Sequence, residues 1–253
     1  GHQWWWEFHY NDYNITTADV MHIPADTVIH VNLFSNNVIH SFWVPQLTGK
    51  TDLIPGHANT KWFKADPGAV NQTFTGICAE YCGDQHGNMR FEVHVDSADS
   101  FQSWVSTQLQ HAAKPAAGSL AEQGLNVFTG AGACSGCHGI VGVGTTTGYV
   151  DTSKVCDDSK GGTSGTNCPV GPNLTHFGGR DLIAGGVLEN NKSECTVDKM
   201  QDTATFMKNC NLARWLYDPG SIKPGNDMAS SIQRGQLTTD QIKELVAYLE
   251  SLQ

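Results

Sequence analysis

The sequence has 253 residues, 39% hydrophobic and 16% charged, which excludes a disordered chain and allows one large domain or two ordinary ones. It contains no apolar run of about eighteen residues, so no membrane-spanning helix is predicted within it. The net charge of −10 argues against nucleic acid and favours a basic protein partner, although acidity could equally serve solubility alone.

Alternating apolar residues predict β-structure in the first hundred residues. In TVIHVNLF (27–34) Ile29, Val31 and Leu33 share one face, and RFEVHVD (90–96) shows the same alternation. Turn signals such as IPGHAN and DPGA lie between these segments. Several short strands with regular turns predict a sandwich or small barrel. A helix is predicted next, with inward-facing apolar residues Phe101, Trp104, Val105 and Leu109.

The segment CAEYCGDQHGNM (78–89) gathers side chains that bind soft metal ions. Thiolates, an imidazole and a thioether suit copper, because zinc sites rarely use methionine. A second imidazole must come from a distant strand, and His40 in NVIHSFWVP is the obvious donor. Two thiolates could then bridge two copper ions, each terminated by one histidine. The C-x₃-C spacing alone would also fit a redox thiol pair, a copper-chaperone site or a disulfide.

VIHSFWVPQLTGKTDLIPGHAN followed by CAEYCGDQHGNM resembles subunit II of the haem–copper cytochrome c oxidases at its dinuclear CuA centre. The resemblance covers essentially residues 1–110 and implies a cupredoxin β-barrel. It also implies that the carboxylate of Glu80 binds a magnesium ion shared with subunit I. The implied copper ligands are the bridging Cys78 and Cys82, the side chains of His40, His86 and Met89, and the main-chain carbonyl of Glu80.

The opening GHQWWWEFHY resembles the aromatic stretch through which this family receives electrons from cytochrome c. By position Trp4 would receive the electron, with Trp5 and Trp6 as its neighbours. Three consecutive tryptophans could instead serve core and interface packing. The remaining eight histidines show no ligand spacing in the sequence and are interpreted as ordinary surface or core residues.

The composition changes after about residue 112. Residues 113–119 are small, polar and proline-bearing, which predicts a linker between a domain at 1–112 and another at 120–253. Apolar residues at helical spacing then predict a helix at 120–128. The chain ends in LTTDQIKELVAYLESL, the clearest helical pattern of all. Its capping box is Thr238 with Gln241, and its buried stripe is Ile242, Leu245, Val246, Leu249 and Leu252.

CSGCH (134–138) carries the C-x-x-C-H signature for covalent attachment of a c-type haem. Cys134 and Cys137 would form thioether bonds to the porphyrin, and His138 would bind the iron. A redox C-x-x-C with an incidental histidine is the alternative.

The surrounding residues resemble a class I cytochrome c, which implies an all-α fold for this domain. GPNL (171–174) matches the segment whose proline carbonyl, here Pro172, accepts a hydrogen bond from the proximal histidine. IKPGNDMASS (222–231) resembles the distal loop and names Met228 as the sixth ligand. Met200 and Met207 compete for that role but lack the flanking Pro-Gly-Asn. The closing helix is expected to cross the first helix, with Tyr248 and Leu249 near Gly124 and Phe128.

Four further cysteines lie outside both motifs, and they can pair in three ways. Neighbour pairing closes the shortest loops and predicts Cys156–Cys168 and Cys195–Cys210. Compared with a minimal cytochrome c, these pairs lie in two apparent insertions, at 144–170 and at roughly 187–212. Disulfides imply an oxidising, extracytoplasmic compartment, whereas four reduced buried thiols are the alternative.

The order of copper domain, linker and haem domain resembles oxidase subunits II with a fused cytochrome c, as in the caa3 type. The expected function is to pass electrons from a donor through haem c and CuA to subunit I, which reduces oxygen. A CuA-bearing nitric oxide reductase subunit, a stand-alone soluble electron carrier and a copper-delivery protein are the rival hypotheses. The resemblance places the protein at the periplasmic face of a bacterial inner membrane, anchored by helices outside this sequence. It implies as partners subunit I, other membrane subunits, and cytochrome c or a quinol-oxidising complex as electron donor.

Overall fold

A computed structural model describes residues 1–141 and 171–253, which divide into two compact units. The N-terminal unit comprises residues 1–110, and the C-terminal unit comprises residues 111–141 and 171–253. In the described residues no helix is long and apolar enough to cross a membrane. The predicted insertion at 144–170 and the predicted Cys156–Cys168 disulfide lie outside the described residues.

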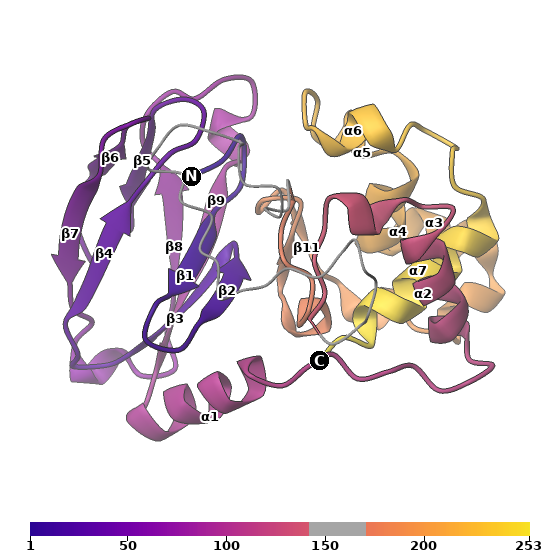
Figure 1. Cartoon of the computed structure of the whole chain (residues 1–253), viewed down its shortest axis with the longest axis horizontal. Coiled ribbons are helices and arrows are strands. Elements are labelled where there is room, and N and C mark those ends of the chain that lie inside the picture. The colour runs from indigo at the N-terminus through magenta and orange to yellow at the C-terminus, as the bar shows by residue number, and fades with distance from the viewer. Residues whose placement is uncertain (142–170) are drawn as a thin grey trace. The chain divides into compact units, whose positions relative to one another are not determined.

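Nine strands build the N-terminal unit (Figure 1). They are β1 (Glu7–Tyr10), β2 (Ile15–Ala18), β3 (Val20–Pro24), β4 (Ile29–Leu33), β5 (His40–Trp43), β6 (Thr51–Leu53), β7 (Asn59–Phe63), β8 (Thr73–Cys78) and β9 (Arg90–Asp96). Five of them form a sheet in the order β3-β9-β8-β5-β6, in which β3 and β9 run parallel and the other pairs antiparallel. The pairs β1-β2 and β4-β7 are separate two-stranded ladders.

The strands enclose an aromatic core. Phe42 on β5 stacks on Phe91 on β9 with ring centres 5.1 Å apart, and lies 6.1 Å from Phe63 on β7. The predicted alternation in β4 and β9 is confirmed, because Leu33, Phe91, Val93 and Val95 are buried while their sequence neighbours are not. The unit is a β-sheet domain, as the sequence predicts at that coarse level.

Helix α1 (Ala98–Gln108) follows the last strand and begins at Ser97, whose side chain accepts a hydrogen bond from the amide of Ser100. Phe101 and Val105 are buried as predicted, but the inward placement of Leu109 is wrong. The helix ends at Gln108, so Leu109 lies beyond it and is 53% exposed.

The C-terminal unit is mainly helical, with one short two-stranded ladder. Its elements are α2 (Leu120–Thr129), β10 (Leu182–Ile183), β11 (Leu188–Glu189), α3 (Thr203–Asn209), α4 (Asn211–Tyr217), α5 (Pro219–Ile222), α6 (Met228–Ser231) and α7 (Thr239–Glu250). The capping box of Thr238 and Gln241 is formed, and the predicted stripe of α7 is buried. Cys195 and Cys210 form the predicted disulfide.

Helices α2 and α7 pack closely against each other, as the sequence predicts. A Cβ atom on Gly124 would lie 2.0 Å from the carbonyl oxygen of Glu244, so only glycine permits this approach. Phe128 and Tyr248 meet edge to face with ring centres 5.8 Å apart. Assignment of the two units as a CuA domain and a cytochrome c domain joined by a linker at 113–119 stays a prediction.

Candidate functional site

The predicted copper ligands meet at one end of the N-terminal unit. His40 is the first residue of β5, Cys78 is the last residue of β8, and the loop from Cys82 to Met89 connects β8 to β9. One nitrogen or sulfur atom each of His40, Cys78 and Cys82 lies within 4.8 Å of the others, and all three residues are buried. These three residues could therefore hold a metal ion.

The sulfur and nitrogen atoms form two matching Cys–His pairs. The Sγ of Cys78 lies 3.9 Å from the Nδ1 of His40, and the Sγ of Cys82 lies 3.7 Å from the Nδ1 of His86. The two Sγ atoms are 3.7 Å apart and form no disulfide. Each imidazole therefore faces a different thiol, an arrangement that matches two bridged ions with one histidine at each.

Weaker donors complete each half of this cluster. The Sδ of Met89 lies 3.9 Å from the Sγ of Cys82, and the main-chain oxygen of Glu80 lies 3.1 Å from the Sγ of Cys78. Met89 is fully buried, whereas the Glu80 side chain is exposed. All six predicted donor groups are thus brought to one place, from segments about forty residues apart.

The protonation states suit metal binding. Hydrogen bonding with the Cys82 thiol, opposed by burial and assisted by His40, lowers the pKa of Cys78 to about 3. Burial lowers the pKa of His40, which keeps its imidazole neutral. Thiolates and neutral imidazoles are the forms that coordinate metal ions.

Two residues that the sequence did not single out support this cluster. The Nε2 of His40 lies 3.1 Å from the Oδ1 of Asn37, which leaves Nδ1 to face Cys78. The Nε2 of Gln3 donates a hydrogen bond of 2.7 Å to the main-chain oxygen of Cys82. Neither residue carries a sequence signal, because an amide side chain becomes a supporting group only through tertiary contact.

Each of the three tryptophans has a different environment. The Nε1 of Trp4 donates to the main-chain oxygen of Cys82 at 2.9 Å. Trp5 stacks on His2 with ring centres 4.3 Å apart, and Trp6 packs between Phe42 and Phe91 in the core. All three are buried, as the packing interpretation requires. Of the three, only Trp4 has a described hydrogen bond to the cysteine loop.

Gly83 allows this contact. Its φ of +113° lies in the region that favours glycine, and a Cβ atom there would sit 3.0 Å from the Trp4 ring. The Cys82–Gly83 turn can therefore approach the indole closely.

In the C-terminal unit, the predicted haem-binding histidine has a defined orientation. The Nδ1 of His138 donates to the carbonyl oxygen of Pro172 at 2.9 Å, and burial lowers its pKa, so the ring is neutral with Nε2 as acceptor. A Cβ atom on Gly171 would lie 2.6 Å from this ring. The imidazole is therefore held in the form that binds iron.

Of the two predicted thioether cysteines, Cys134 begins the short helical turn η3 (Cys134–Gly136) and Cys137 follows it directly. Both are half-buried, and neither is disulfide-bonded. Burial raises the pKa of Cys134 to about 11. Met228 begins α6 and is half-buried against the core of this unit, while Met200 is only 4% exposed inside that core. The structure describes no contact between Met228 and His138.

Known proteins resemble this chain along its whole length. Residues 15–97 match the family described as cytochrome c oxidase subunit II, periplasmic domain. Cytochrome c oxidase subunit 2 of Bacillus sp. (strain PS3) is 35% identical over 99% of the chain, and that of Bacillus subtilis (strain 168) is 32% identical over 98%. The chain spans 60% of the length of each relative.

One solved structure matches part of the N-terminal half. The periplasmic domain of subunit II of cytochrome oxidase of Bradyrhizobium japonicum is 33% identical, with a TM-score of 0.40. The match covers 43% of this chain and 88% of that one. With the family match and the buried Cys–His cluster, the conclusion is that this chain carries, over residues 15–97, a periplasmic domain of the cytochrome c oxidase subunit II family.

Proposed function

We propose that the chain is the electron-receiving subunit II of a haem–copper terminal oxidase, with a dinuclear copper centre in its N-terminal unit and a covalently bound haem c in its C-terminal unit. The observation that carries this proposal is the pair of Cys–His contacts at 3.9 and 3.7 Å around two thiols 3.7 Å apart. Relatives named cytochrome c oxidase subunit 2, aligned over nearly the whole chain, favour oxygen over nitric oxide as the final acceptor.

The proposed ligands of the copper pair are the six donor groups of the cysteine cluster described above. Bound copper supplies a one-electron redox couple. Cys78, the last residue of β8, and Cys82, in the loop that follows, would hold the two ions as bridging thiolates. The remaining proposed ligands are His40, His86, Met89 and the main-chain oxygen of Glu80. Burial of the cluster excludes water, and a rigid site limits the rearrangement that accompanies a change of charge.

Trp4 is the proposed point at which this domain receives electrons. Its indole N–H donates to the main-chain oxygen of the proposed copper ligand Cys82, which gives a short covalent and hydrogen-bonded connection from ring to ligand. Trp5 and Trp6 adjoin it in sequence and would support the same surface by packing.

The C-terminal unit is proposed to be a class I cytochrome c domain. Haem c, when bound, supplies a second one-electron couple. Cys134 and Cys137 would attach it, while His138 and Met228 would ligate its iron. The fit is supported by the His138 imidazole, whose Nδ1–H is fixed by Pro172 so that Nε2 keeps its lone pair.

The proposed partners are subunit I and the other membrane subunits, with cytochrome c or a quinol-oxidising complex as donor. The exposed Glu80 carboxylate beside the cysteine loop is available for a magnesium ion shared with subunit I. The Cys195–Cys210 disulfide supports the proposed extracytoplasmic location, because disulfides persist in oxidising compartments.

Electron paramagnetic resonance of the oxidised full chain, with optical spectra of the same sample, tests this proposal. We expect an unpaired electron shared evenly by two copper nuclei and one low-spin haem. A mononuclear copper signal in fully loaded protein would contradict the dinuclear centre. Absence of covalent haem after expression with a haem-attachment system would contradict the C-terminal assignment.

A further inference from the structure

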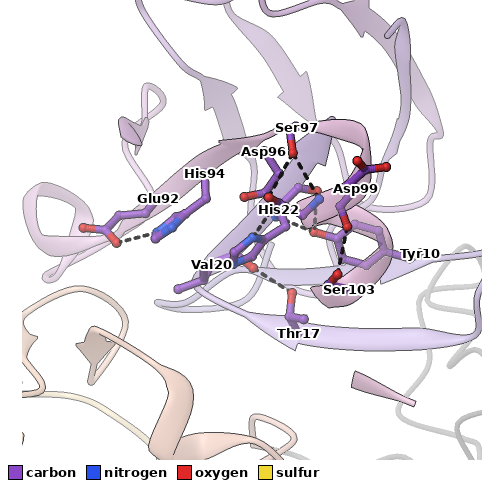
Figure 2. A network of polar contacts seen from close by, with 11 residues as sticks. Tyr10, Thr17, Val20, His22, Glu92, His94, Asp96, Ser97, Asp99 and Ser103 are labelled. Carbon is purple, nitrogen blue, oxygen red and sulfur yellow. Dashed lines mark hydrogen bonds and ion pairs between the residues drawn. The ribbon is translucent and has the colours of Figure 1, made fainter. Parts of the chain in front are cut away.

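A second group of metal-ligating side chains lies on the five-stranded sheet, outside the cysteine cluster. Glu92, His94 and Asp96 alternate along β9 and share the face opposite the buried Phe91, Val93 and Val95. In the parallel register of β3 with β9, His22 stands directly opposite His94. Figure 2 shows these side chains together with the contacts between them.

Each histidine in this group is oriented by its own carboxylate. The Nδ1 of His22 lies 2.8 Å from Asp96, and the Nε2 of His94 lies 3.1 Å from Glu92. The other ring nitrogens, Nε2 of His22 and Nδ1 of His94, have no hydrogen-bond partner within the described part of the chain. A carboxylate on one nitrogen and a lone pair on the other is the usual arrangement of a metal-binding histidine.

His22 is held firmly before any ion binds. Its main-chain N–H donates to the hydroxyl of Tyr10 at 2.7 Å, and that hydroxyl donates to its carbonyl oxygen at 3.1 Å (Figure 2). Its ring stacks on Trp104 with ring centres 4.6 Å apart. The His94 ring lies beside it, with ring centres 4.7 Å apart and the two ring planes tilted by 31°. A site assembled on strands and fixed by packing loses little conformational entropy on binding.

We propose that His22 and His94 form a binding site for Zn²⁺ or a similar first-row divalent ion, with Asp96 and Glu92 as supporting carboxylates. Metal–nitrogen bonds of about 2.0–2.1 Å place the ring centres of two imidazoles on one ion roughly 4.5–5 Å apart, and the observed separation is 4.7 Å. Two carboxylates balance the charge of a divalent ion. The four side chains are 18–24% exposed, so an ion can reach them.

This site differs from the cysteine cluster in its donor chemistry, and the proposal does not depend on the copper centre. Imidazole and carboxylate donors suit Zn²⁺, Ni²⁺ or Cu²⁺, whereas the thiolates and thioether of the cysteine cluster favour soft ions such as Cu⁺. The sequence did not reveal it, because His22 and His94 are 72 residues apart and meet only through the parallel pairing of β3 with β9.

The test is a titration of the full chain with Zn²⁺ by calorimetry and with Co²⁺ by optical absorption. Besides any ion taken up by the cysteine cluster, we expect one further equivalent that gives weak visible Co²⁺ bands without adding to the strong near-ultraviolet thiolate-to-cobalt band of a cysteine site. His22→Gln and His94→Gln should each abolish this equivalent, and Asp96→Asn should weaken it about tenfold. Bound Zn²⁺ should also raise the Tm of wild-type protein.

Matched controls are His30→Gln, at an exposed position on β4, and His9→Gln, which alters the separate His–Glu contact of His9 with Glu7. Both should bind like wild type. If binding survives His94→Gln, or is lost in His9→Gln instead, the proposal is wrong. Among the described rings His94 contacts His22 alone, so His94→Gln remains informative even if His22→Gln fails to fold.

Discussion

Cys78 and Cys134 each begin a cysteine pair followed by a histidine, but their surroundings drive the two thiols in opposite directions. Hydrogen bonding within the cluster lowers the pKa of Cys78 to about 3, whereas burial without a comparable donor raises the pKa of Cys134 to about 11. A thiolate is the form that coordinates metal, while a protonated thiol does not. The comparison separates a cluster ready to bind an ion from a turn whose Cys134 thiol stays protonated.

The two units also differ in how completely their structures bring the predicted ligands together. Strands β5 and β8 bring His40 and Cys78 into contact, and the loop adds both remaining side chains that face Cys82. In the C-terminal unit His138 is fixed by Pro172, but Met228 lies on a short separate helix. The strands and loop of the N-terminal unit therefore pre-form its predicted ligand set, whereas the predicted ligands of the C-terminal unit are only partly brought together.

The largest expected effect comes from removing a proposed bridge. Cys82→Ser should eliminate the dinuclear copper signal, because one sulfur cannot hold both ions in the same arrangement. Elemental analysis and electron paramagnetic resonance of the dialysed protein measure this loss. Cys134→Ala is the matched control and should retain full copper content. A dinuclear signal that persists in Cys82→Ser would break the contrast between the two cysteine pairs.

The next effect tests the proposed distal ligand. Met228→Leu should keep covalent haem, since Cys134 and Cys137 remain, but should convert its spectrum from low-spin to high-spin. Met200→Leu is the comparison, because Met200 is buried in the core and should leave the spectrum unchanged. Optical absorption of both oxidised variants measures the haem spin state. A high-spin Met200→Leu together with a low-spin Met228→Leu would instead assign Met200 as the iron ligand.

Removal of the disulfide should affect only the C-terminal unit. The double variant Cys195→Ser with Cys210→Ser opens a loop with a sequence separation of 15 residues. A loop of that length corresponds to about 3 kcal/mol in the free energy of unfolding. Urea unfolding followed by haem absorption should report the loss, while the copper signal of the N-terminal unit stays constant. An equal loss of unfolding free energy by the haem and the copper signals would show that the two units unfold together.

The smallest effect concerns a buried carboxyl at the end of α7. Burial raises the pKa of Glu250 from 4.5 to about 7, and its Oε1 has no hydrogen-bond partner within the described residues. Between these pH values the folded protein binds a proton that the unfolded chain has released, so the free energy of unfolding falls as pH rises from about 4.5 to 7.

Glu250→Gln should therefore match wild type at pH 4 and be more stable at pH 8, by roughly 1–3 kcal/mol. Denaturant unfolding at both pH values checks the difference. If the free energy of unfolding of the variant differs from that of wild type by the same amount at pH 4 and at pH 8, the substitution acts through packing rather than through titration of Glu250.

Local patterns in the sequence predicted the elements whose residues interact along the chain. The capping box of Thr238 with Gln241, the stripe of α7 and the alternation of β9 were all predictable, because each depends on neighbours within a few positions. The Cys195–Cys210 pairing was predictable for the same reason of short separation. Leu109 was misplaced because periodicity does not show where a helix ends.

The sequence by itself determined which donor atoms the two motifs offer, namely sulfur and imidazole nitrogen. Only the tertiary structure decided which nitrogen of His40 faces Cys78, that Gln3 and Trp4 both donate to Cys82, and that His22 stands beside His94. These relations depend on strand pairing between segments far apart in the chain. A local pattern specifies the conformation of its own backbone, whereas the register of two distant strands is set by the packing of the whole core.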